Sequence, residues 1–220
     1  ILPEQFNMEE GYLQRFTREA QIAASLEHPN IVNIYDFGTQ DGVNYIAMRL
    51  LEGGTLAERV RETRSGTVEL PSLSETAKML TEISDALDYA HSKNIIHRDI
   101  KPSNIMFDKD GKAYLVDFGI AKPIDIAHQV TLPGTSMGTV AYMSPEQWRG
   151  DPLTAKVDQY ALGLVIYTIV TGQPPYDVPV EAPYALMHKH LNETPIPAHR
   201  VKLTILPAMS AVIERSIAKR

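Results

Sequence analysis

Apolar side chains recur every three to four positions along several stretches of the chain, which is the spacing of amphipathic helices. This spacing predicts helices over residues 9–26, 55–64, 74–92, 183–191 and 205–218. Residues 157–170 are almost uniformly apolar, and a helix of this kind is expected to be buried on all sides. Ser74 is the expected N-cap of the 74–92 helix, although Ala77 supplies no capping-box partner three positions later.

Two pairs of apolar runs predict strands. Residues 31–37 and 43–51 read as strands joined by a short linker that begins and ends with glycine. Shorter runs at 105–107 and 113–116 flank an Asp-Gly turn at residues 108–111. An Asp-Gly pair between apolar runs is a strong signal for a β-hairpin.

The composition is that of a globular protein and excludes several classes. The chain has 220 residues, of which 44% are hydrophobic and 22% are charged. Its formal net charge is −6 and it has no run of lysine or arginine, so nucleic-acid binding has no electrostatic basis here. It has no cysteine, which excludes disulfides and cysteine-ligated metals and agrees with a reducing compartment. The longest uncharged apolar run, residues 161–170, is too short to span a bilayer.

Polar residues gather on both sides of the predicted 105–116 hairpin. Asn104 precedes it and Asp117 follows it, so the hairpin returns the Asp117 carboxylate to the level of the Asn104 amide oxygen. Oxygen ligands of this kind suit Mg²⁺, which keeps phosphate oxygens in its coordination shell. Asp99 lies a few residues upstream, where it can accept a hydroxyl proton, and Lys101 adds a positive charge for a phosphate.

These residues carry a family resemblance. The pattern H-R-D-x-x-x-x-N at residues 97–104, followed by Asp-Phe-Gly at 117–119, resembles the catalytic loop and metal-binding segment of protein kinases. Residues 144–146, Ser-Pro-Glu, stand where the family has Ala-Pro-Glu. Lys101 and the segment at Thr139 resemble the Ser/Thr group of kinases rather than the Tyr group. The style of the motifs resembles the bacterial, eukaryotic-like branch.

The resemblance implies an α+β, two-lobe fold with a small β-rich N-lobe and a mainly α-helical C-lobe. Residues 1–51 would form a partial N-lobe that ends at the hinge, and residues 52–220 would form the C-lobe. The family's Gly-rich loop and strand lysine are not in this sequence. We expect a longer protein, with that lysine just before Ile1 and a further family arginine beyond Arg220.

The implied activity is transfer of the γ-phosphoryl group of ATP, with Mg²⁺, to Ser or Thr of protein substrates in signalling. The resemblance assigns catalysis to four residues, of which the last two are also the magnesium ligands: Asp99, Lys101, Asn104 and Asp117. It assigns nucleotide binding to a second set: Glu19, Met48, Arg49, Leu51 and Met106.

The nucleotide-binding positions differ in the roles that the resemblance implies. Glu19 would pair with the strand lysine, and Met48 would be the gatekeeper residue. The backbone of Arg49 and Leu51 would hydrogen-bond adenine. Many relatives carry an acidic residue where Arg49 stands, and recognition through the backbone should tolerate this difference.

Residues 120–139 have no clear period and are rich in Thr, Ser, Pro and Gly, and by resemblance they are the activation loop. Phosphorylation is expected on one or more of three hydroxyls: Thr131, Thr135 and Ser136. The expected pocket for that phosphate is basic: Arg98, Lys122 and Arg15. Structural roles are implied for five further residues: Phe118, Gly119, Thr139, Glu146 and Asp158.

Asp158 opens the apolar 157–170 helix, and in relatives the matching aspartate braces the backbone of the His-Arg-Asp turn. A buried aspartate needs such hydrogen-bond partners. His28 and His91 are interpreted as packing residues with no chemistry.

Two other interpretations stay open at this stage. A degenerate kinase used as a scaffold or regulatory binding module would explain the missing Gly-rich loop and lysine. A small-molecule kinase can share the catalytic loop, but Lys101-Pro102 and residues 144–146 favour protein substrates. The expected partners are ATP, protein substrates and a second copy of the chain for autophosphorylation. The expected location is the cytoplasm, with any membrane anchor outside this segment.

Overall fold

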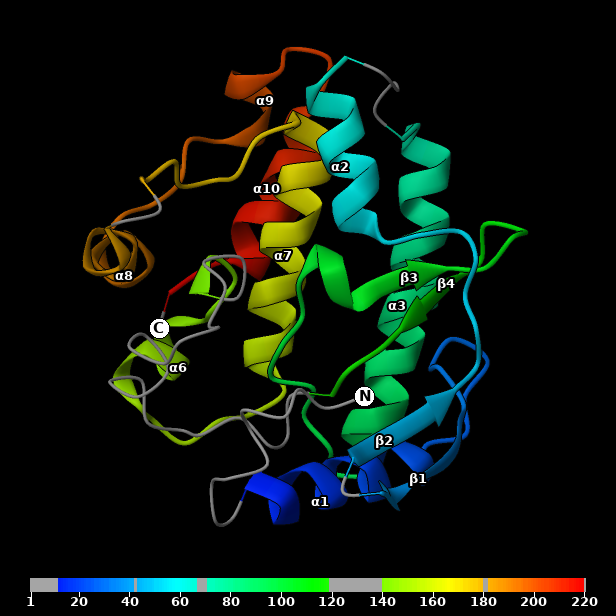
Figure 1. Cartoon of the computed structure of the whole chain (residues 1–220). Helices are drawn as coiled ribbons and strands as arrows, with labels where there is room; N and C mark the ends of the chain where they lie inside the picture. Colours follow the sequence, from blue (N-terminus) through cyan, green and yellow to red (C-terminus); the bar gives the residue numbers. More distant parts are fainter. Residues whose placement is uncertain (1–11, 42, 67–70, 119–139, 180–181, 220) are drawn as a thin grey trace.

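The computed structural model describes residues 12–41, 43–66, 71–118, 140–179 and 182–219. The N-terminal part holds helix α1 (Tyr12–Ala24) and strands β1 (Ile34–Gln40) and β2 (Val43–Met48). The two strands pair antiparallel, with an irregularity between Ile34 and Asp36, and α1 packs beside β1 (Figure 1). β1 runs further than predicted, because Gly38, Thr39 and Gln40 continue the ladder with β2.

The remaining part is mainly helical. A second antiparallel hairpin, β3 (Ile105–Phe107) and β4 (Ala113–Leu115), follows a 3-10 turn at Pro102–Asn104. The helices are α2 (Leu56–Arg64), α3 (Leu73–Ser92), α6 (Pro145–Arg149), α7 (Lys156–Thr171), α8 (Pro183–Asn192), α9 (Ala198–Val201) and α10 (Pro207–Ser216). The predicted 105–116 hairpin is confirmed. Among the described residues, no helix is long and apolar enough to cross a membrane.

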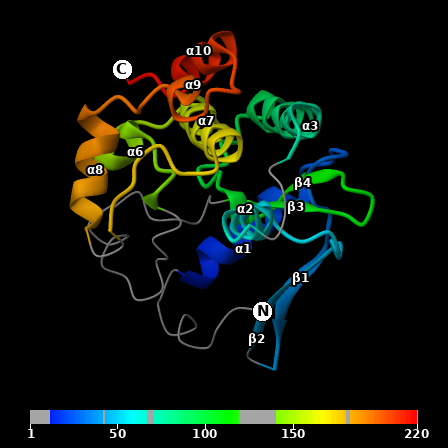
Figure 2. The same cartoon turned by 90° about the horizontal axis from the view of Figure 1, so that it is seen from above.

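Helix α7 is the centre of the helical part, with α3, α9 and α10 packed around it (Figures 1 and 2). Its buried residues lie on all sides of the helix, which confirms the prediction from its uniformly apolar sequence. Ile83 and Leu87 of α3, Ile105 and Leu115 of the hairpin, and Val165 of α7 belong to one buried cluster. This shared core fixes the hairpin against α3 and α7.

The predicted N-cap of α3 is wrong. Ser72, not Ser74, caps the helix: its hydroxyl accepts a hydrogen bond from the Glu75 N–H at 3.2 Å. The Glu75 carboxylate accepts the Ser72 N–H at 2.8 Å in return. This reciprocal capping box determines where the helix begins, because the partner that Ser74 lacks three positions later is present for Ser72.

Candidate active site

A buried carboxylate holds the turn that precedes Asp99. Asp158 lies in the first turn of α7, and its Oδ2 accepts the His97 N–H while its Oδ1 accepts the Arg98 N–H, both at 2.8 Å. Arg98 has a φ of +67°, a left-handed conformation that costs about 1–3 kcal/mol in a non-glycine residue. The two hydrogen bonds therefore stabilise a turn that the backbone alone disfavours.

The same carboxylate has a third partner that the sequence interpretation missed. His91, in the last turn of α3, places Nε2 2.7 Å from Oδ2 of Asp158. His91 therefore hydrogen-bonds to the carboxylate that holds the His97–Arg98 turn, and it is more than a packing residue. Its position at the end of a helix, six residues before His97, was the available signal.

The side chains of Asp99, Lys101 and Asn104 form one polar cluster. Lys101 Nζ lies 3.0 Å from Asp99 Oδ2, and Asn104 Nδ2 donates to the same oxygen at 2.9 Å. Asn104 Nδ2 also donates to the Asp99 backbone carbonyl at 2.9 Å. The 3-10 turn at Pro102–Asn104 brings the amide back to Asp99, so the spacing of the motif orients the carboxylate.

Asp117 follows β4 and is tied to the same cluster through the backbone. The Val116 N–H donates to the Asn104 carbonyl at 3.0 Å, so the chain enters Asp117 directly beside Asn104. Asp117 has a φ of +55° and an exposed side chain, whereas Phe118 is buried. Two of the four positive-φ non-glycine residues in the described chain thus belong to this site: Arg98, which directly precedes Asp99, and Asp117, which is itself one of the predicted catalytic residues.

His97 connects the turn to the end of β4. Its ring is buried 4.5 Å from the Phe118 ring centroid, and its Nδ1 accepts the Asp99 N–H at 3.3 Å. Its Nε2 lies 3.2 Å from the Val116 carbonyl, to which it donates. Burial lowers the pKa of His97 despite the charges of Asp158 and Asp99, so the neutral ring acts as a fixed spacer.

Asn104 and Asp117 present the donor set that Mg²⁺ prefers. Since Nδ2 of Asn104 donates to Asp99, the amide oxygen is the atom that can face a cation; it accepts a long hydrogen bond of 3.5 Å from the Ser103 hydroxyl and keeps a second lone pair. Within the described ranges, no group of three or more His, Asp or Glu side chains could hold a metal. A pair of oxygen ligands suits a magnesium ion whose remaining ligands come from phosphate and water. The residues present therefore fit the ion.

Three of the predicted nucleotide-binding residues, Met48, Leu51 and Met106, lie near Asp117 or the strand that precedes it. Met48 and Asp117 line the same small pocket, together with Phe118. Leu51 belongs to a neighbouring apolar cluster with Val32, Tyr114 and Val116, against which Met106 packs. The structure thus brings Met48, Leu51 and Met106 close to the end of β4.

Several predicted residues lie outside the part of the chain that the structure describes. These are Gly119, Lys122, Thr131, Thr135, Ser136 and Thr139, and the side chains of Arg15 and Glu19. Arg98 is described, and its Nε is buried without a hydrogen-bond partner among the described residues. Glu146 lies on α6, whose Gln147 donates from Nε2 to the Arg98 carbonyl at 2.8 Å.

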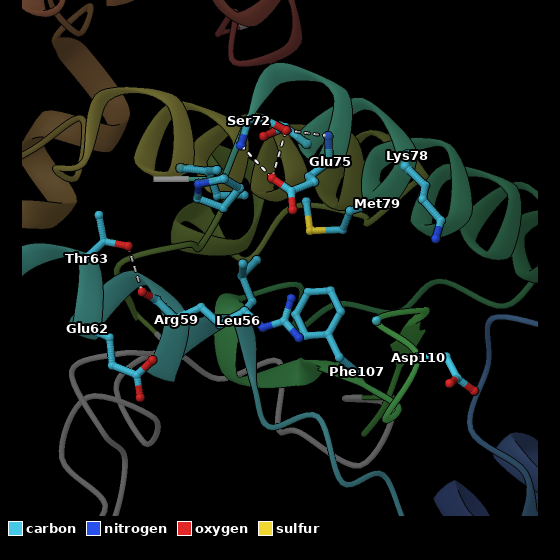
Figure 3. A pocket seen from close by; sticks show the side chains of 14 residues that line it. Leu56, Arg59, Glu62, Thr63, Ser72, Glu75, Lys78, Met79, Phe107 and Asp110 are labelled. Carbon is cyan, nitrogen blue, oxygen red and sulfur yellow. Dashed lines mark hydrogen bonds between the residues drawn. The ribbon is translucent and has the colours of Figure 1, made fainter. Parts of the chain in front are cut away.

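A larger pocket, of about 660 Å³, lies between α2, α3 and the tip of the β3–β4 hairpin (Figure 3). Arg59 and Phe107 both line this pocket, and the Arg59 guanidinium lies over the Phe107 ring, with Cζ 3.4 Å from the ring centroid. None of the predicted catalytic residues lines this pocket. We therefore place the candidate active site at the catalytic loop and not in the more voluminous cavity.

Known families and proteins resemble this chain along most of its length. The family model described as "Protein kinase domain" matches residues 3–207. The chain is 38% identical over 219 residues to the serine/threonine-protein kinase PrkC of Bacillus subtilis, covering 100% of this chain and 33% of that protein. It is 37% identical over 214 residues to the serine/threonine-protein kinase PknB of Mycolicibacterium smegmatis, covering 95% of this chain and 33% of that protein. The chain thus spans about a third of the length of the curated relatives it matches.

A solved structure gives the same result for the fold. The C20A mutant of the kinase domain of Mycobacterium tuberculosis PknI superposes with a TM-score of 0.71 at 27% sequence identity, covering 99% of this chain and 74% of that chain. The α+β prediction of an incomplete two-lobe architecture is thereby confirmed.

Proposed function

The chain belongs to the protein kinase family, and we propose that it forms most of the catalytic domain of a Ser/Thr kinase that phosphorylates proteins. The observation that carries the proposal is the cluster of Asp99, Lys101 and Asn104, joined by side-chain contacts of 2.9–3.0 Å next to Asp117. Phosphoryl transfer requires mainly positioning and neutralisation of charge, which such a cluster supplies.

Each residue of the cluster has a separate role in the proposed reaction. The Asp99 carboxylate, oriented by Lys101 and Asn104, accepts the proton of the substrate hydroxyl. Lys101 balances negative charge on the transferred phosphoryl group. Asn104 and Asp117 would hold Mg²⁺, which neutralises charge on the phosphates when it is bound.

We further propose that Arg98, with Arg15 and Lys122, receives a phosphate on the activation loop. The buried Nε of Arg98 supports this, because an unsatisfied guanidinium nitrogen is costly unless an anion approaches it. The candidate phosphorylation sites stay Thr131, Thr135 and Ser136. We place residues 1–51 in the N-lobe, 52–220 in the C-lobe, and the domain in the cytoplasm, in keeping with the absence of cysteine.

The test uses the full-length protein with Mg-ATP and a generic basic protein substrate. Asp99→Asn is expected to lower kcat by about 10²–10⁴-fold, the range for loss of a general base. Asp110→Asn, at an exposed carboxylate in the hairpin turn, is the matched control and should retain wild-type kcat.

Binding of Mg-ATP separates catalysis from a scaffold role. Asp117→Asn should abolish the Mg²⁺-dependent part of ATP affinity, whereas Asp99→Asn should preserve it. Unchanged turnover in Asp99→Asn would remove Asp99 from its role. A wild-type protein that binds Mg-ATP but transfers no phosphate would favour the regulatory binding module instead.

A further inference from the structure

The segment that leaves β2 is joined by side chains to the β3–β4 hairpin. Arg49, one residue after β2, donates from Nη1 to the Tyr114 hydroxyl at 2.8 Å. Its Nη2 lies 3.5 Å from Oδ2 of Asp108, and the Tyr114 hydroxyl donates to the same oxygen at 3.2 Å. The three side chains therefore form a closed triangle, which we call the Arg49 clamp.

The hairpin side of the clamp is rigid. Oδ1 of Asp108 accepts the N–H groups of Asp110 and Lys112, both at 3.0 Å, which fixes the carboxylate across the turn. Burial works to raise the pKa of Asp108, but these backbone hydrogen bonds, with Tyr114 and Arg49, keep that pKa below its ordinary value. Asp108 is therefore ionised at neutral pH and is a fixed acceptor for the guanidinium.

The same segment is attached to the hairpin at a second point. The Gly53 N–H donates to the Phe107 carbonyl at 2.8 Å, and the Phe107 N–H donates to the Gly54 carbonyl at 2.9 Å. A Cβ on Gly53 would lie 2.3 Å from the Asp108 carbonyl oxygen, so only glycine permits this approach. Residues 49–54 are thus held to one hairpin at both ends.

The β3–β4 hairpin is connected to both parts of the proposed nucleotide site, the backbone expected to contact adenine and the magnesium ligand Asp117. The backbone expected to contact adenine, at Arg49 and Leu51, lies inside the doubly attached segment, and Leu51 packs against Tyr114. The Arg49 N–H donates to the Asn33 carbonyl at 2.9 Å and is therefore not the group that contacts adenine. Tyr114 lies three residues before the proposed magnesium ligand Asp117, on the strand that leads to it.

We propose that Arg49 is a positioning residue for the nucleotide through its side chain: the clamp holds the adenine-contacting backbone at a fixed distance from Asp117. This inference rests on the proposed function. A planar guanidinium can reach the Tyr114 hydroxyl and the Asp108 carboxylate together, whereas a lysine ammonium on the same backbone cannot match both directions. The residue type at this position therefore matters even though the backbone makes the contacts with adenine.

The experiment measures ADP affinity, KM for ATP and kcat in the full-length protein. Arg49→Met keeps the aliphatic stem and removes the guanidinium, and it should raise KM for ATP and the Kd for ADP about fivefold, a loss of roughly 1 kcal/mol, with kcat within about twofold. Arg49→Lys should recover part of the affinity, and Tyr114→Phe should weaken it in the same direction. Adding Tyr114→Phe to Arg49→Met should change little, because both remove the same clamp.

Arg149→Met on α6 is the matched control. Its side chain is 39% exposed, against 40% for Arg49, and it has one acidic partner, Asp151, also at 3.5 Å. The control should leave the Kd for ADP and the KM for ATP at wild-type values.

Three outcomes would overturn the inference. The first is an Arg49→Met protein with wild-type ADP affinity and KM, and the second is a fall in Tm and kcat with KM unchanged, which would indicate a merely structural role. If Arg49→Met does not fold, the Tyr114→Phe variant decides the question. The third outcome that would overturn the inference is wild-type ADP affinity in Tyr114→Phe. ADP binding is measured without turnover, so a wild-type protein that transfers no phosphate would refute the proposed function and leave this test intact.

Discussion

Replacing Asp158 by asparagine changes one atom of the group that holds the turn at His97 and Arg98. Each carboxylate oxygen accepts one backbone N–H at 2.8 Å, so an amide nitrogen in either position would face a donor. The substitution removes one charge-assisted hydrogen bond, about 1.5–3 kcal/mol, and leaves a buried N–H unsatisfied, about 1–3 kcal/mol. We expect the free energy of unfolding to fall by about 3–5 kcal/mol, the range for breaking a buried charged contact.

The same substitution should lower activity beyond its effect on stability. Arg98 has a φ of +67° and donates its N–H to Asp158, and Asp99 is the next residue. Relaxation of the turn would move the Asp99 carboxylate away from Lys101 and Asn104. We therefore expect kcat to fall at least about tenfold, because displacement of a reacting group by about 1 Å can cost more than that.

Urea denaturation measures the stability change, and kcat is compared at a temperature where both proteins are folded. Asp151→Asn is the control, because this carboxylate is 45% exposed and should change stability by less than about 0.5 kcal/mol. An Asp158→Asn protein within about 1 kcal/mol of wild type and with full kcat would refute the reasoning, since the two hydrogen bonds would then carry little energy.

Two further predictions concern stability. Ser72→Ala should lower the free energy of unfolding by about 1 kcal/mol through loss of the capping box, and Ser74→Ala should change it by less than about 0.5 kcal/mol; equal effects in thermal denaturation would contradict the assignment. Burial, helped by the charge of Lys219, lowers the pKa of His190 to about 3, so the unfolded chain binds more protons as the pH falls below about 6.5. The wild type should therefore lose about 2 kcal/mol more than His190→Gln between pH 7 and pH 5, measured by chemical denaturation, and parallel pH profiles would argue against a buried neutral ring.

The sequence predicted those features that depend on local spacing. The apolar period located α7 and α3, and the Asp-Gly turn located the β3–β4 hairpin. The length of that hairpin then determines that Val116 returns to Asn104, which is why one-dimensional spacing placed Asp117 beside the catalytic loop. Helices α6 and α9 escaped prediction because five and four residues are too few to show a period.

The brace of Asp158 on the His97–Arg98 turn was predicted from the family resemblance, but contacts between distant residues that no motif marks were not. His91 and Asp158 are 67 positions apart, and Arg49 and Tyr114 are 65 positions apart. No local pattern marks such pairs, because nothing near His91 or Arg49 in the sequence identifies the residue that each of them contacts. Ser74 was a different kind of error: Ser72 followed by Glu75 satisfies the capping rule within the sequence itself, so this signal was present and was missed.

The location of Asp158 makes the geometry of the catalytic loop depend on the packing of the buried helix α7. The carboxylate sits at the start of the most deeply enclosed helix, so any substitution that rotates or shifts α7 also shifts the anchor beneath the His97–Arg98 turn. Val165 and Ile169 of α7 belong to the buried cluster that α7 shares with α3 and the hairpin, so a substitution at either should lower kcat although neither lies in the catalytic loop. We therefore expect inactivating substitutions in this domain to include residues along α7 as well as residues of the candidate active site.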